Sequence, residues 1–585
     1  MKLRVLALAA ALSAACLPAI AQSAPSVRDL AGLWQAQRRT PALEGVAVVE
    51  HGADGWRAEL RGVRAAGVET AGRVAFDLGE GRVLTLDPRP VKGALRGWWQ
   101  QGPGAFNAYG FLTPVTLAAE AKGRWSGRVE PLPDQFTLHL PVTVGADGKA
   151  AAFLRNPEQN AGRMLDVRRV ELADGQARLM GFPFGARIEE AVATGPFDAD
   201  NEVLSLYMPR VGQAYEFRRV GDGNASGFHP RAQPSAGYRY QVPPARSDGW
   251  PTASVEQVGI SREAIEALVR RIIDTPDTGR QSSRVHALLI ARHGRLVVEE
   301  YFHGFDRDTL HDTRSAGKSL TATITGAAIQ AGYPLSTSTP VYPAMNGGVV
   351  PDGLDPRKRA MTVEHLLTMT SGYHCDDEDP AAPGNEDTMQ SQRVQRDWYR
   401  FTLDLPMAFA PGERAIYCSV NPNLLGGVVA RAAGRPQEDL FRDLVAEPLG
   451  IRRYALNTQP TGEPYMGGGL YMAPRDYIKL GQMMMDGGVW KGRRVVSRAW
   501  AERATAPLQS IGGRGYGYLW WSQDYPYRGG TVRAIYAAGN GGQIVMIVPE
   551  LDLLISFWGG NYGERAARIP QEVYVPELIL PAVAR

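Results

Sequence analysis

Cysteine is almost absent from this chain, with three residues among 585. The sequence contains neither a CxxC nor an HExxH pattern, which are typical of thiol-redox, zinc-binding and metalloprotease sites. The formal net charge is only +3, and no long run of lysine and arginine occurs, which disfavours a nucleic-acid partner. The sequence therefore predicts no metal centre and no cofactor, and it points away from DNA or RNA.

Long apolar runs are missing after the first residues, so no later stretch is expected to cross a bilayer. At the N-terminus, basic residues precede the apolar run VLALAAALSAACL, and AIAQ follows it. This pattern predicts a signal peptide over residues 1–21, cleaved after Ala21, and a periplasmic or secreted protein. The alternatives are a membrane anchor, for which the run is short, and a lipoprotein at Cys16, where Ser13 replaces the usual leucine.

Residues 22–222 are rich in short alternating segments, such as RVLTLDP, FTLHLPVTV and VLSLYMPRV, between Gly, Asp and Pro turns. GLWQAQ near residue 32 resembles GRWSGRV near residue 123, and two longer segments echo each other in the same way. We interpret this region as a β-rich domain, with a two-fold repeat as one option, built as one closed barrel or two small sheets. Residues 223–255, rich in Gly, Pro and Ser, indicate a linker.

Residues 256–585 show a mixed pattern. SREAIEALVRRIID predicts an amphipathic helix that Ser261 caps. VHALLIARHGRLVVEEYF predicts a hairpin turning at residues 293–294, and GQIVMIVPELDLLISFW predicts a second one turning at residues 549–552. The helical segments VEHLLTMTSG, NLLGGVVARAAG and QEDLFRDLVAEPLG lie between them. Strands at both ends predict one antiparallel sheet, with a largely helical insertion between them.

The stretch TRSAGKSLTATITGAAIQAG places Ser315 three residues before Lys318, at the predicted start of a helix. Residues i and i+3 share a helix face, so the lysine can point at the serine hydroxyl. Burial would lower the pKa of Lys318 and make it a usable base for Ser315. Taken alone, the pattern is explained better by a capping serine and a solvated lysine.

Five segments follow one another in the order SAGKS, MTVEHLLTMTSGY, APGERAIYCS, GGGLYMAPRDYIKLGQMM and GNGGQIVMIVP. Together they resemble the serine hydrolase family of class C β-lactamases, penicillin-binding D,D-peptidases, related esterases and 6-aminohexanoate-dimer hydrolase, over residues 250–560. The resemblance implies an α/β fold of the β-lactamase/transpeptidase type: an antiparallel sheet flanked by helices, plus a helical subdomain. An all-β, barrel-like N-terminal domain would precede this hydrolase domain at residues 256–585.

The resemblance also implies a role for particular residues. Ser315 would be the nucleophile that forms an acyl-enzyme, Lys318 its base, and Tyr417 a proton shuttle whose pKa nearby cations lower. The backbone N–H groups of Ser315 and Gln543 would form the oxyanion hole. The substrate-binding motifs of the family fall on Ser419, Asn540, Gly541 and Gly542.

Two of these motifs depart from the family pattern. Ser419 replaces the asparagine of Tyr-x-Asn, and Asn540 stands where lysine or histidine is usual. Both changes remove contacts that a penicillin would use, so a small ester or amide is the favoured substrate. A β-lactamase, a D,D-peptidase and a non-catalytic binding protein are the alternatives. Arg314 or Arg533 could supply a cation, although a surface role fits each of them better.

Aromatic residues near the motifs are weaker candidates. Trp520 and Trp521 could line the acyl pocket, although a place in the core is favoured. Three residues after the MTSG turn could form a pocket rim or only a structural loop: Tyr373, His374 and Asp376.

Export would leave Cys375 and Cys418 as the only cysteines of the mature chain. In an oxidising compartment they could form a disulfide that fixes Tyr417, or they could stay as two buried thiols.

Overall fold

The computed structural model describes residues 25–584, except residues 71, 105–108, 159–164, 184–186, 210–211, 222–226, 232–233, 277–278, 280–281 and 392–395. The predicted signal peptide and Cys16 lie outside the described residues. The chain divides into two compact units. The first comprises Met1–Trp34, Pro141–Phe153 and Leu165–Arg219, and the second comprises Gln35–Leu140, Leu154–Met164 and Val220–Arg585. The second unit therefore unites part of the predicted β-rich domain with the whole predicted hydrolase domain.

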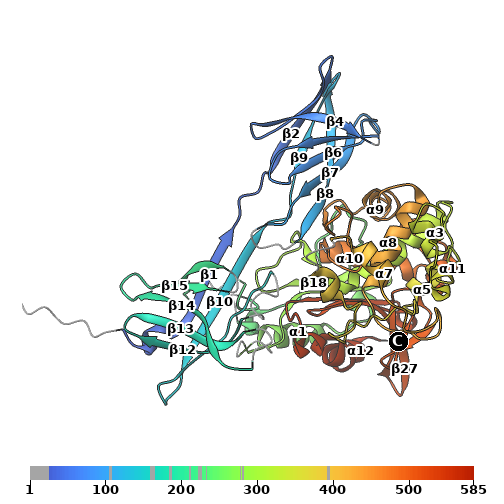
Figure 1. The fold of residues 1–585 in the computed structure, drawn as a ribbon. Helices are drawn as coiled ribbons and strands as arrows, with labels where there is room; N and C mark the ends of the chain where they lie inside the picture. The colour runs from blue at the N-terminus through green and yellow to red at the C-terminus, as the bar shows by residue number, and fades with distance from the viewer. Residues whose placement is uncertain are drawn as a thin grey trace, which may run out of the picture. The chain divides into compact units, whose positions relative to one another are not determined.

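A closed barrel of antiparallel strands contains the strands of the first unit, together with residues 35–39 and 135–140, which are assigned to the second unit (Figure 1). Its strands, in barrel order, are β1 (Gly32–Arg39), β10 (Gln135–Val144), β11 (Ala150–Ala152), β12 (Leu165–Ala173), β13 (Gln176–Pro183), β14 (Glu190–Asp198), β15 (Val203–Met208) and β16 (Gln213–Arg219). A short 3₁₀ turn, η1 (Val27–Leu30), precedes β1. Along β15, Leu204, Leu206 and Met208 are buried and alternate with more exposed residues, as a half-buried strand requires. The expected barrel-like β fold near the N-terminus is confirmed.

A second group of strands, β2 to β9, lies in the larger unit. The strands are β2 (Gly45–Gly52), β3 (Gly55–Leu60), β4 (Val63–Thr70), β5 (Arg73–Asp77), β6 (Val83–Leu86), β7 (Leu95–Gln101), β8 (Gly110–Ala121) and β9 (Arg124–Val129). Each pairs with the next, β2 pairs with β9, and the β8–β9 pairing closes the ring. Trp56, Phe76 and Trp99 are among the residues buried within this group.

Strand β8 also joins this ring to the C-terminal part of the unit. It pairs with β20 (Tyr454–Thr458), which is followed in the same sheet by β21 (Leu470–Met472) and β19 (His311–Asp312). Nearby, the buried Trp98 of β7 donates its Nε1–H to Asp439 Oδ1 at 2.9 Å, and Arg73 forms an ion pair with the same carboxylate. Hydrogen-bonded strands and buried polar contacts thus attach residues 35–140 to the C-terminal part.

An eight-stranded antiparallel sheet forms the centre of the larger unit, in the order β18-β17-β29-β28-β27-β26-β25-β24. The strands are β17 (Val285–Arg292), β18 (Arg295–Tyr301), β24 (Gln509–Ile511), β25 (Arg514–Tyr516), β26 (Trp521–Tyr527), β27 (Gly530–Gly539), β28 (Gln543–Val548) and β29 (Leu553–Gly559). Both predicted hairpins are confirmed, since β17 turns into β18 at residues 293–294 and β28 connects to β29 through residues 549–552. Pairing of β17 with β29 brings the two ends of the predicted domain together, as expected.

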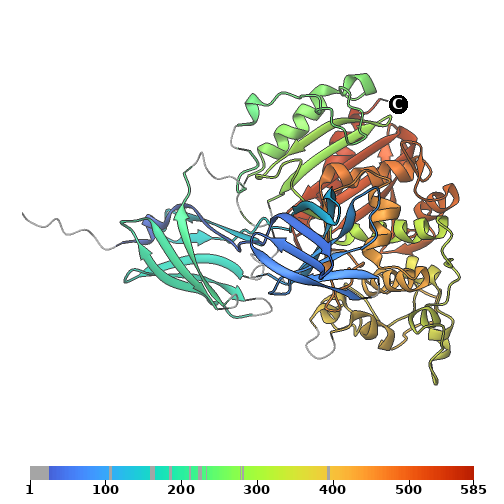
Figure 2. The same ribbon diagram turned by 90° about the horizontal axis from the view of Figure 1, so that it is seen from above.

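Helices cover both faces of this sheet (Figures 1 and 2). Residues of α1 (Arg262–Ile273) and η9 (Pro570–Ile579) share one buried cluster with Leu288 and Ile290 of β17. Residues of α2 (Lys318–Gln330), α8 (Val420–Ala433) and α10 (Pro474–Met485) share the other cluster with Leu289. The predicted cap of α1 is confirmed, because the Ser261 side chain accepts from the Ala264 N–H.

The remaining helices form the helical insertion and the sheet edges. They are α3 (Val341–Met345), α4 (Pro356–Arg359), α5 (Val363–Leu367), α6 (Glu386–Gln390), α7 (Trp398–Asp404), α9 (Gln437–Phe441), η6 (Arg442–Ala446), α11 (Arg498–Thr505) and α12 (Leu580–Ala582). A two-stranded ribbon joins β22 (Val489–Trp490) and β23 (Arg493–Arg494). In the described part of the chain, no helix is long and apolar enough to cross a membrane.

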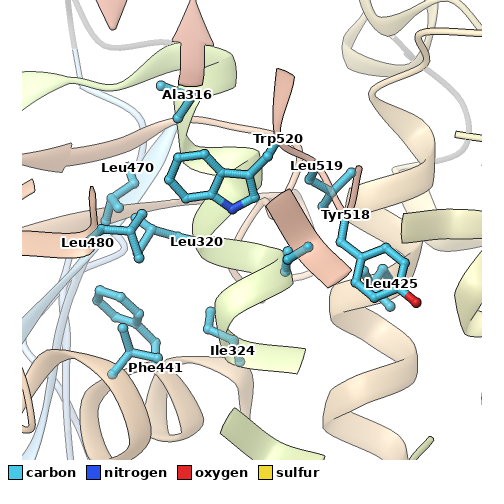
Figure 3. Packing of buried hydrophobic residues seen from close by; sticks show 14 of the residues in the cluster. Ala316, Leu320, Ile324, Leu425, Phe441, Leu470, Leu480, Tyr518, Leu519 and Trp520 are labelled. Carbon is cyan, nitrogen blue, oxygen red and sulfur yellow. The ribbon is translucent and has the colours of Figure 1, made fainter. Parts of the chain in front are cut away.

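Helix α2 runs through the largest buried cluster. Leu320 and Ile324 of α2 lie among buried side chains from distant segments, including Phe441, Leu470 and Trp520 (Figure 3). A helix buried on all sides cannot shift easily, because interiors are closely packed. The residues at its N-terminus are therefore held firmly relative to the sheet.

Candidate active site

Ser315 lies on a short 3₁₀ segment, η5 (Arg314–Gly317), that continues directly into α2. Arg314 has a φ of +48°, a left-handed conformation that non-glycine residues rarely adopt. The Asp312 carboxylate accepts the Arg314 N–H at 2.8 Å and supports this turn. Strained backbone of this kind is common at functional sites, and here it immediately precedes the predicted nucleophile.

The structure brings Ser315 and Lys318 together. Lys318 Nζ lies 2.7 Å from Ser315 Oγ and 2.5 Å from the backbone oxygen of Gly467. The lysine is only 1% exposed. Burial lowers its pKa, but the opposing charges of Tyr417, Glu386 and Asp377 outweigh burial, so the pKa of Lys318 is raised. The expectation of a lowered lysine pKa is therefore wrong, because the sequence did not reveal the acids around it.

Tyr417 completes this group. Lys318 Nζ lies 5.1 Å from the centre of the Tyr417 ring, and the ring stacks on Trp521 with centroids 5.4 Å apart. Burial raises the pKa of Tyr417, and the charge of Lys318 and hydrogen bonds to Ser315 and Lys318 only partly offset this. The expected lowering of the tyrosine pKa is also wrong, because burial outweighs the nearby cation.

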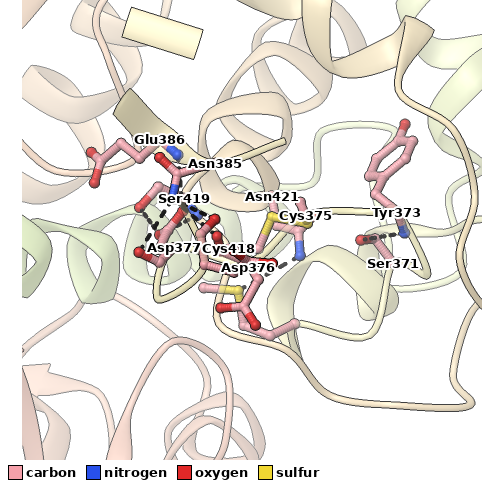
Figure 4. Close-up of a disulfide and its surroundings, with 12 residues drawn as sticks. Ser371, Tyr373, Cys375, Asp376, Asp377, Asn385, Glu386, Cys418, Ser419 and Asn421 are labelled. Carbon is pink, nitrogen blue, oxygen red and sulfur yellow. Dashed lines mark hydrogen bonds between the residues drawn. A yellow bond between two sulfur atoms is a disulfide. The ribbon is translucent and has the colours of Figure 1, made fainter. Parts of the chain in front are cut away.

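Asp377 is a residue of this site that the sequence-based prediction missed. Its carboxylate oxygen Oδ2 accepts both the Ser419 hydroxyl, at 2.6 Å, and the Ser419 N–H, at 2.8 Å (Figure 4). Burial and the charge of Glu386 raise the pKa of Asp377 to about 7, although Lys318 and the two Ser419 hydrogen bonds act against this. The carboxylate therefore changes charge near neutral pH.

The Ser419 side chain is turned toward Asp377. It is completely buried, and its hydroxyl and N–H are both used by Asp377. Ser419 thus holds an acid in this structure, and its predicted contact with a substrate stays a prediction. The acidic run HCDDEDP after the MTSG turn was the available signal, but only the fold shows which of its carboxylates turns inward.

Glu386 is the second acid near the lysine. It stands at the start of α6, and its carboxylate accepts the Tyr465 hydroxyl and the Gln390 amide. Tyr109, from the segment before β8, donates its hydroxyl to Gln390 Oε1 at 2.6 Å. Tyr109, which directly precedes β8, is therefore connected to Glu386 through a single intervening side chain, that of Gln390.

A disulfide joins Cys375 to Cys418, with Cα atoms 5.9 Å apart (Figure 4). Both cysteines are buried. The bond ties the Asp377 loop to the residue after Tyr417. The backbone reinforces this link, because the Asp377 N–H donates to the backbone oxygen of Tyr417 at 3.1 Å.

Strand β27 is the sheet strand that approaches the turn carrying Ser315. A Cβ atom on Gly539, its last residue, would lie 2.3 Å from the Thr313 oxygen and 3.0 Å from the Ala316 nitrogen. Glycine is therefore required for this close approach. Gln543 begins the next strand, and its buried side chain binds the backbone of Asn540 and Gly559.

The residues between these strands are held by the loop that follows β29. Asn540 is exposed, and its Oδ1 accepts the Gly563 N–H at 2.6 Å. Gly541 and Gly542 both have φ of +100°, and a Cβ on Gly541 would meet the Tyr562 ring at 2.7 Å. These glycines are explained by backbone conformation, and their predicted contact with a substrate stays a prediction.

The sequence model of the family described as Beta-lactamase matches residues 265–563, just over half of the chain. The chain belongs to the Beta-lactamase family. A 6-aminohexanoate-dimer hydrolase from Paenarthrobacter ureafaciens is 32% identical over 272 residues, which are 44% of this chain and 67% of that protein.

The solved structures to which the chain is similar are more distant in sequence. EstCE1, described as a hydrolase with promiscuous acyltransferase activity, is 16% identical, with a TM-score of 0.43, over 53% of this chain and 98% of that one. A penicillin-binding protein from Bacillus halodurans is 19% identical, with a TM-score of 0.39, over 49% of this chain and 96% of that one.

Of the other predicted candidates in this Beta-lactamase family protein, some lie beside Ser315 or Tyr417 and the others lie in the core or on the surface. Trp520 is 1% exposed and belongs to the core, whereas Trp521 stacks on Tyr417. Arg314 pairs with Asp312 and lies over the Tyr562 ring beside the nucleophile, so a plain surface role does not describe it. Arg533 instead pairs with Asp524 on the exposed side of β26.

The predicted candidates in the loop after the MTSG turn also differ in burial. Tyr373 is buried and its hydroxyl lies 2.9 Å from that of Tyr342, so it is structural. His374 is exposed, and Asp376 accepts the Glu378 N–H. Among the described residues, no cluster of three or more His, Cys, Asp or Glu side chains could hold a metal ion.

Proposed function

We propose that the protein is an exported serine hydrolase that forms an acyl-enzyme at Ser315 and hydrolyses a small ester or amide. One observation carries the proposal: Lys318 Nζ lies 2.7 Å from Ser315 Oγ at a helix start and 5.1 Å from the centre of the Tyr417 ring. A nucleophile within hydrogen-bond reach of a base, which a third group orients, is the arrangement that covalent catalysis needs.

The proton of Ser315 would pass to Tyr417. Lys318 donates to the serine and the Gly467 oxygen, so its ammonium stabilises a tyrosinate and the developing alkoxide. Tyr417 Oη accepts the Ser315 proton while Oγ attacks the acyl carbon, and the phenol then protonates the leaving group. Water enters by the reverse sequence and releases the acid. Because the pKa of Tyr417 is raised, the reactive tyrosinate is a minor form at neutral pH.

The oxyanion would be held by backbone N–H groups. Ser315 supplies one donor from the turn into α2, where the helix dipole also favours negative charge. Gly539 makes a close contact with η5. This contact favours the backbone N–H of Asn540, the residue directly after β27, as the second donor over the backbone N–H of Gln543. Gln543 as the second donor stays a prediction.

Substrate choice follows from the charges around Ser315. The end of β27 reads YAAGN over residues 536–540, so the strand beside the nucleophile offers no cation to a substrate carboxylate. The negative charges of Glu386 and Asp377 raise the pKa of Lys318, and Arg314 is paired with Asp312. An uncharged ester, or an amide without an obligatory carboxylate, fits this charge distribution better than a penicillin.

Export is supported by two features. The first 21 residues have the sequence of a signal peptide, and the disulfide between Cys375 and Cys418 suits an oxidising compartment. Mass spectrometry of the protein secreted to the periplasm should show a mature N-terminus at Gln22. Retention of residues 1–21 in the exported protein would contradict the cleavage site.

The reaction is tested by fluorophosphonate labelling and by turnover of p-nitrophenyl esters and amides. Ser315→Ala should remove labelling and lower turnover by at least about 10³-fold, since the nucleophile is lost. Ser338→Ala changes an exposed serine in the same way and should leave both signals unchanged. Unlabelled wild-type protein would favour a non-catalytic binding role, and faster turnover of nitrocefin than of esters would favour the β-lactamase alternative.

A further inference from the structure

Two parts of the proposed active site come from segments that lie far apart in the sequence. The turn η5 carries Ser315, and the loop after β27 runs from Asn540 to Gln543, the two candidates for the second oxyanion donor. An oxyanion hole works only when both backbone donors point at the same oxygen, so the two parts must keep a fixed separation. A side chain that touches both parts can therefore control the rate.

The segment after β29 fastens the loop between β27 and β28. Asn540 Oδ1 accepts the Gly563 N–H at 2.6 Å, and the backbone oxygen of Gly541 accepts the Asn561 N–H at 3.1 Å. Tyr562, the residue between these two donors in the sequence, is only 3% exposed. A Cβ atom on Gly541 would lie 2.7 Å from carbon atoms of the Tyr562 ring. The ring therefore packs directly on the backbone of this loop.

The same ring touches the residue before Ser315. The guanidinium carbon Cζ of Arg314 lies 4.9 Å from the centre of the Tyr562 ring, which is within the range of a cation–π interaction. Arg314 Nε forms an ion pair with Asp312 Oδ2 at 2.7 Å, and the Arg314 N–H donates to Oδ1 of the same carboxylate. The side chain and the backbone of Arg314 are thus both fixed at the turn into α2.

Arg314 cannot move far without moving the nucleophile. Its φ of +48° is a strained conformation, which persists only where the surrounding structure holds it. A Cβ atom on Gly468 would lie 2.9 Å from the Arg314 oxygen, and one on Gly539 would lie 3.1 Å from the Arg314 Cβ. The turn is therefore packed between two close backbone segments, and its side chain reaches the Tyr562 ring.

We propose that Tyr562 is a positioning residue, which couples the turn of Ser315 to the loop between β27 and β28 so that both oxyanion donors face one oxygen. Its contacts with Arg314 and Gly541 involve the ring and not the hydroxyl. Tyr562 acts through these two neighbours and not on the substrate itself. The inference rests on the proposed hydrolase function, because it concerns the rate of acyl transfer to Ser315.

Tyr562→Leu in the full mature chain removes the ring. It should lower kcat for p-nitrophenyl esters about 10- to 100-fold, because a misplaced oxyanion donor acts much like a lost one. KM should change by less than about threefold, since the oxyanion hole is used in the transition state and not in substrate binding. The rate of fluorophosphonate labelling at Ser315 should fall together with kcat, because the phosphonyl oxygen takes the place of the oxyanion.

Tyr562→Phe is the conservative variant. It keeps the ring that touches Arg314 and Gly541, so it should recover kcat to within about threefold of the wild-type value. A role of the hydroxyl would instead make Tyr562→Phe as slow as Tyr562→Leu, and this result would contradict coupling through the ring.

Tyr574→Leu is the matched control for the loss of a buried ring. Tyr574 is also 3% exposed, and the guanidinium carbon of Arg271 lies 5.6 Å from the centre of its ring. It packs in the buried cluster of α1 and η9, which does not contain α2. Tyr574→Leu should lower the urea unfolding midpoint, as Tyr562→Leu does, and leave kcat unchanged.

A double-mutant cycle separates coupling from two independent effects. Arg314→Met removes the guanidinium from the ring and should lower kcat about tenfold by itself, because the turn loses this contact. Since both substitutions break the same contact, kcat of the double variant should lie within about threefold of the slower single variant. Should Tyr562→Leu fail to fold, the folded Arg314→Met protein still tests the contact.

The result that overturns the inference differs from the one that overturns the proposed function. A kcat of Tyr562→Leu equal to that of Tyr574→Leu, losses that multiply in the double variant, or an unchanged kcat in Arg314→Met would each refute the positioning role in an active enzyme. Wild-type protein that is neither labelled nor active would refute both proposals together.

Discussion

Ser419 gives both its hydroxyl and its backbone N–H to one carboxylate oxygen of Asp377, at 2.6 Å and 2.8 Å. The serine follows Cys418, whose disulfide partner Cys375 lies two residues before Asp377. The acid near Lys318 is therefore fixed by a covalent bond and two hydrogen bonds. This arrangement takes the place that the amide of Tyr-x-Asn has in the family pattern.

The pH dependence of stability should report on Asp377. Its pKa is raised to about 7, so between its ordinary value of 3.8 and 7 the folded protein holds a proton that the unfolded chain releases. The free energy of unfolding must then fall by about 4 kcal/mol in all between pH 3.8 and pH 7, about 2.7 kcal/mol of it above pH 5, and level off above pH 7. Asp377→Asn should remove this contribution, as measured by urea unfolding of both proteins at pH 5 and pH 8.

Ser419→Ala is the companion variant for that measurement. The hydroxyl of Ser419 lowers the pKa of Asp377, so its loss should move the inflection to higher pH. An inflection at the same pH in Ser419→Ala and in wild type would show that Asp377 is not the group that titrates.

The rate of ester hydrolysis should rise with pH. The proposed base is the tyrosinate of Tyr417, whose pKa is raised above its ordinary value of 10. Between pH 7 and pH 9, kcat/KM should therefore increase about tenfold per unit, as the reactive fraction grows. Tyr417→Phe should lower kcat/KM by about 10²–10⁴ and flatten the profile.

Tyr207→Phe, on an exposed site of the barrel, serves as the control for this profile. A steep rise that persists in Tyr417→Phe would assign proton transfer to another group, with Lys318 as the first candidate.

Loss of the disulfide should weaken both the fold and the site. The bond closes a loop with a sequence separation of 43 residues, for which chain entropy predicts about 4 kcal/mol of stabilisation. Cys375→Ser and Cys418→Ser should each lower the free energy of unfolding by a similar amount and reduce kcat, because Tyr417 and the Asp377 loop are no longer tied. Urea unfolding with and without reductant measures the effect. A further loss on reducing either variant would show that another group is involved.

The β2–β9 strands should contribute to the stability of the hydrolase part. Trp98 is 1% exposed and donates to Asp439 at 2.9 Å, so Trp98→Ala removes a large buried side chain and a hydrogen bond. We expect a loss of about 3–5 kcal/mol, measured as a lower unfolding midpoint together with loss of esterase activity. Val68→Ala changes a 63% exposed residue of the same ring and should have little effect. Full activity of Trp98→Ala after partial unfolding of the ring would contradict this view.

The local order of the hydrolase part could be predicted from short-range sequence signals. The α1 helix is fixed by its cap and its apolar face, and the two hairpins are fixed by turn residues between alternating strands. The pairing of β17 with β29 could also be predicted from the sequence, because strands at the two ends of a domain require partners. The contact between Ser315 and Lys318 could be predicted because their spacing of three is a local property of a helix.

The tertiary structure alone decided the pKa shifts of Lys318 and Tyr417 and the pairing of β8 with β20. Whether a buried lysine or tyrosine has a raised or lowered pKa depends on which distant acids surround it, and Asp377 and Glu386 come close to Lys318 only after folding. The pairing of β8 also depends on the tertiary structure, because its partner strand β20 lies more than 300 residues later in the chain. The sequence by itself determined that Ser315 and Lys318 lie together on one helical turn. Long-range packing decided its charge state and its neighbours, because these depend on contacts that no local pattern encodes.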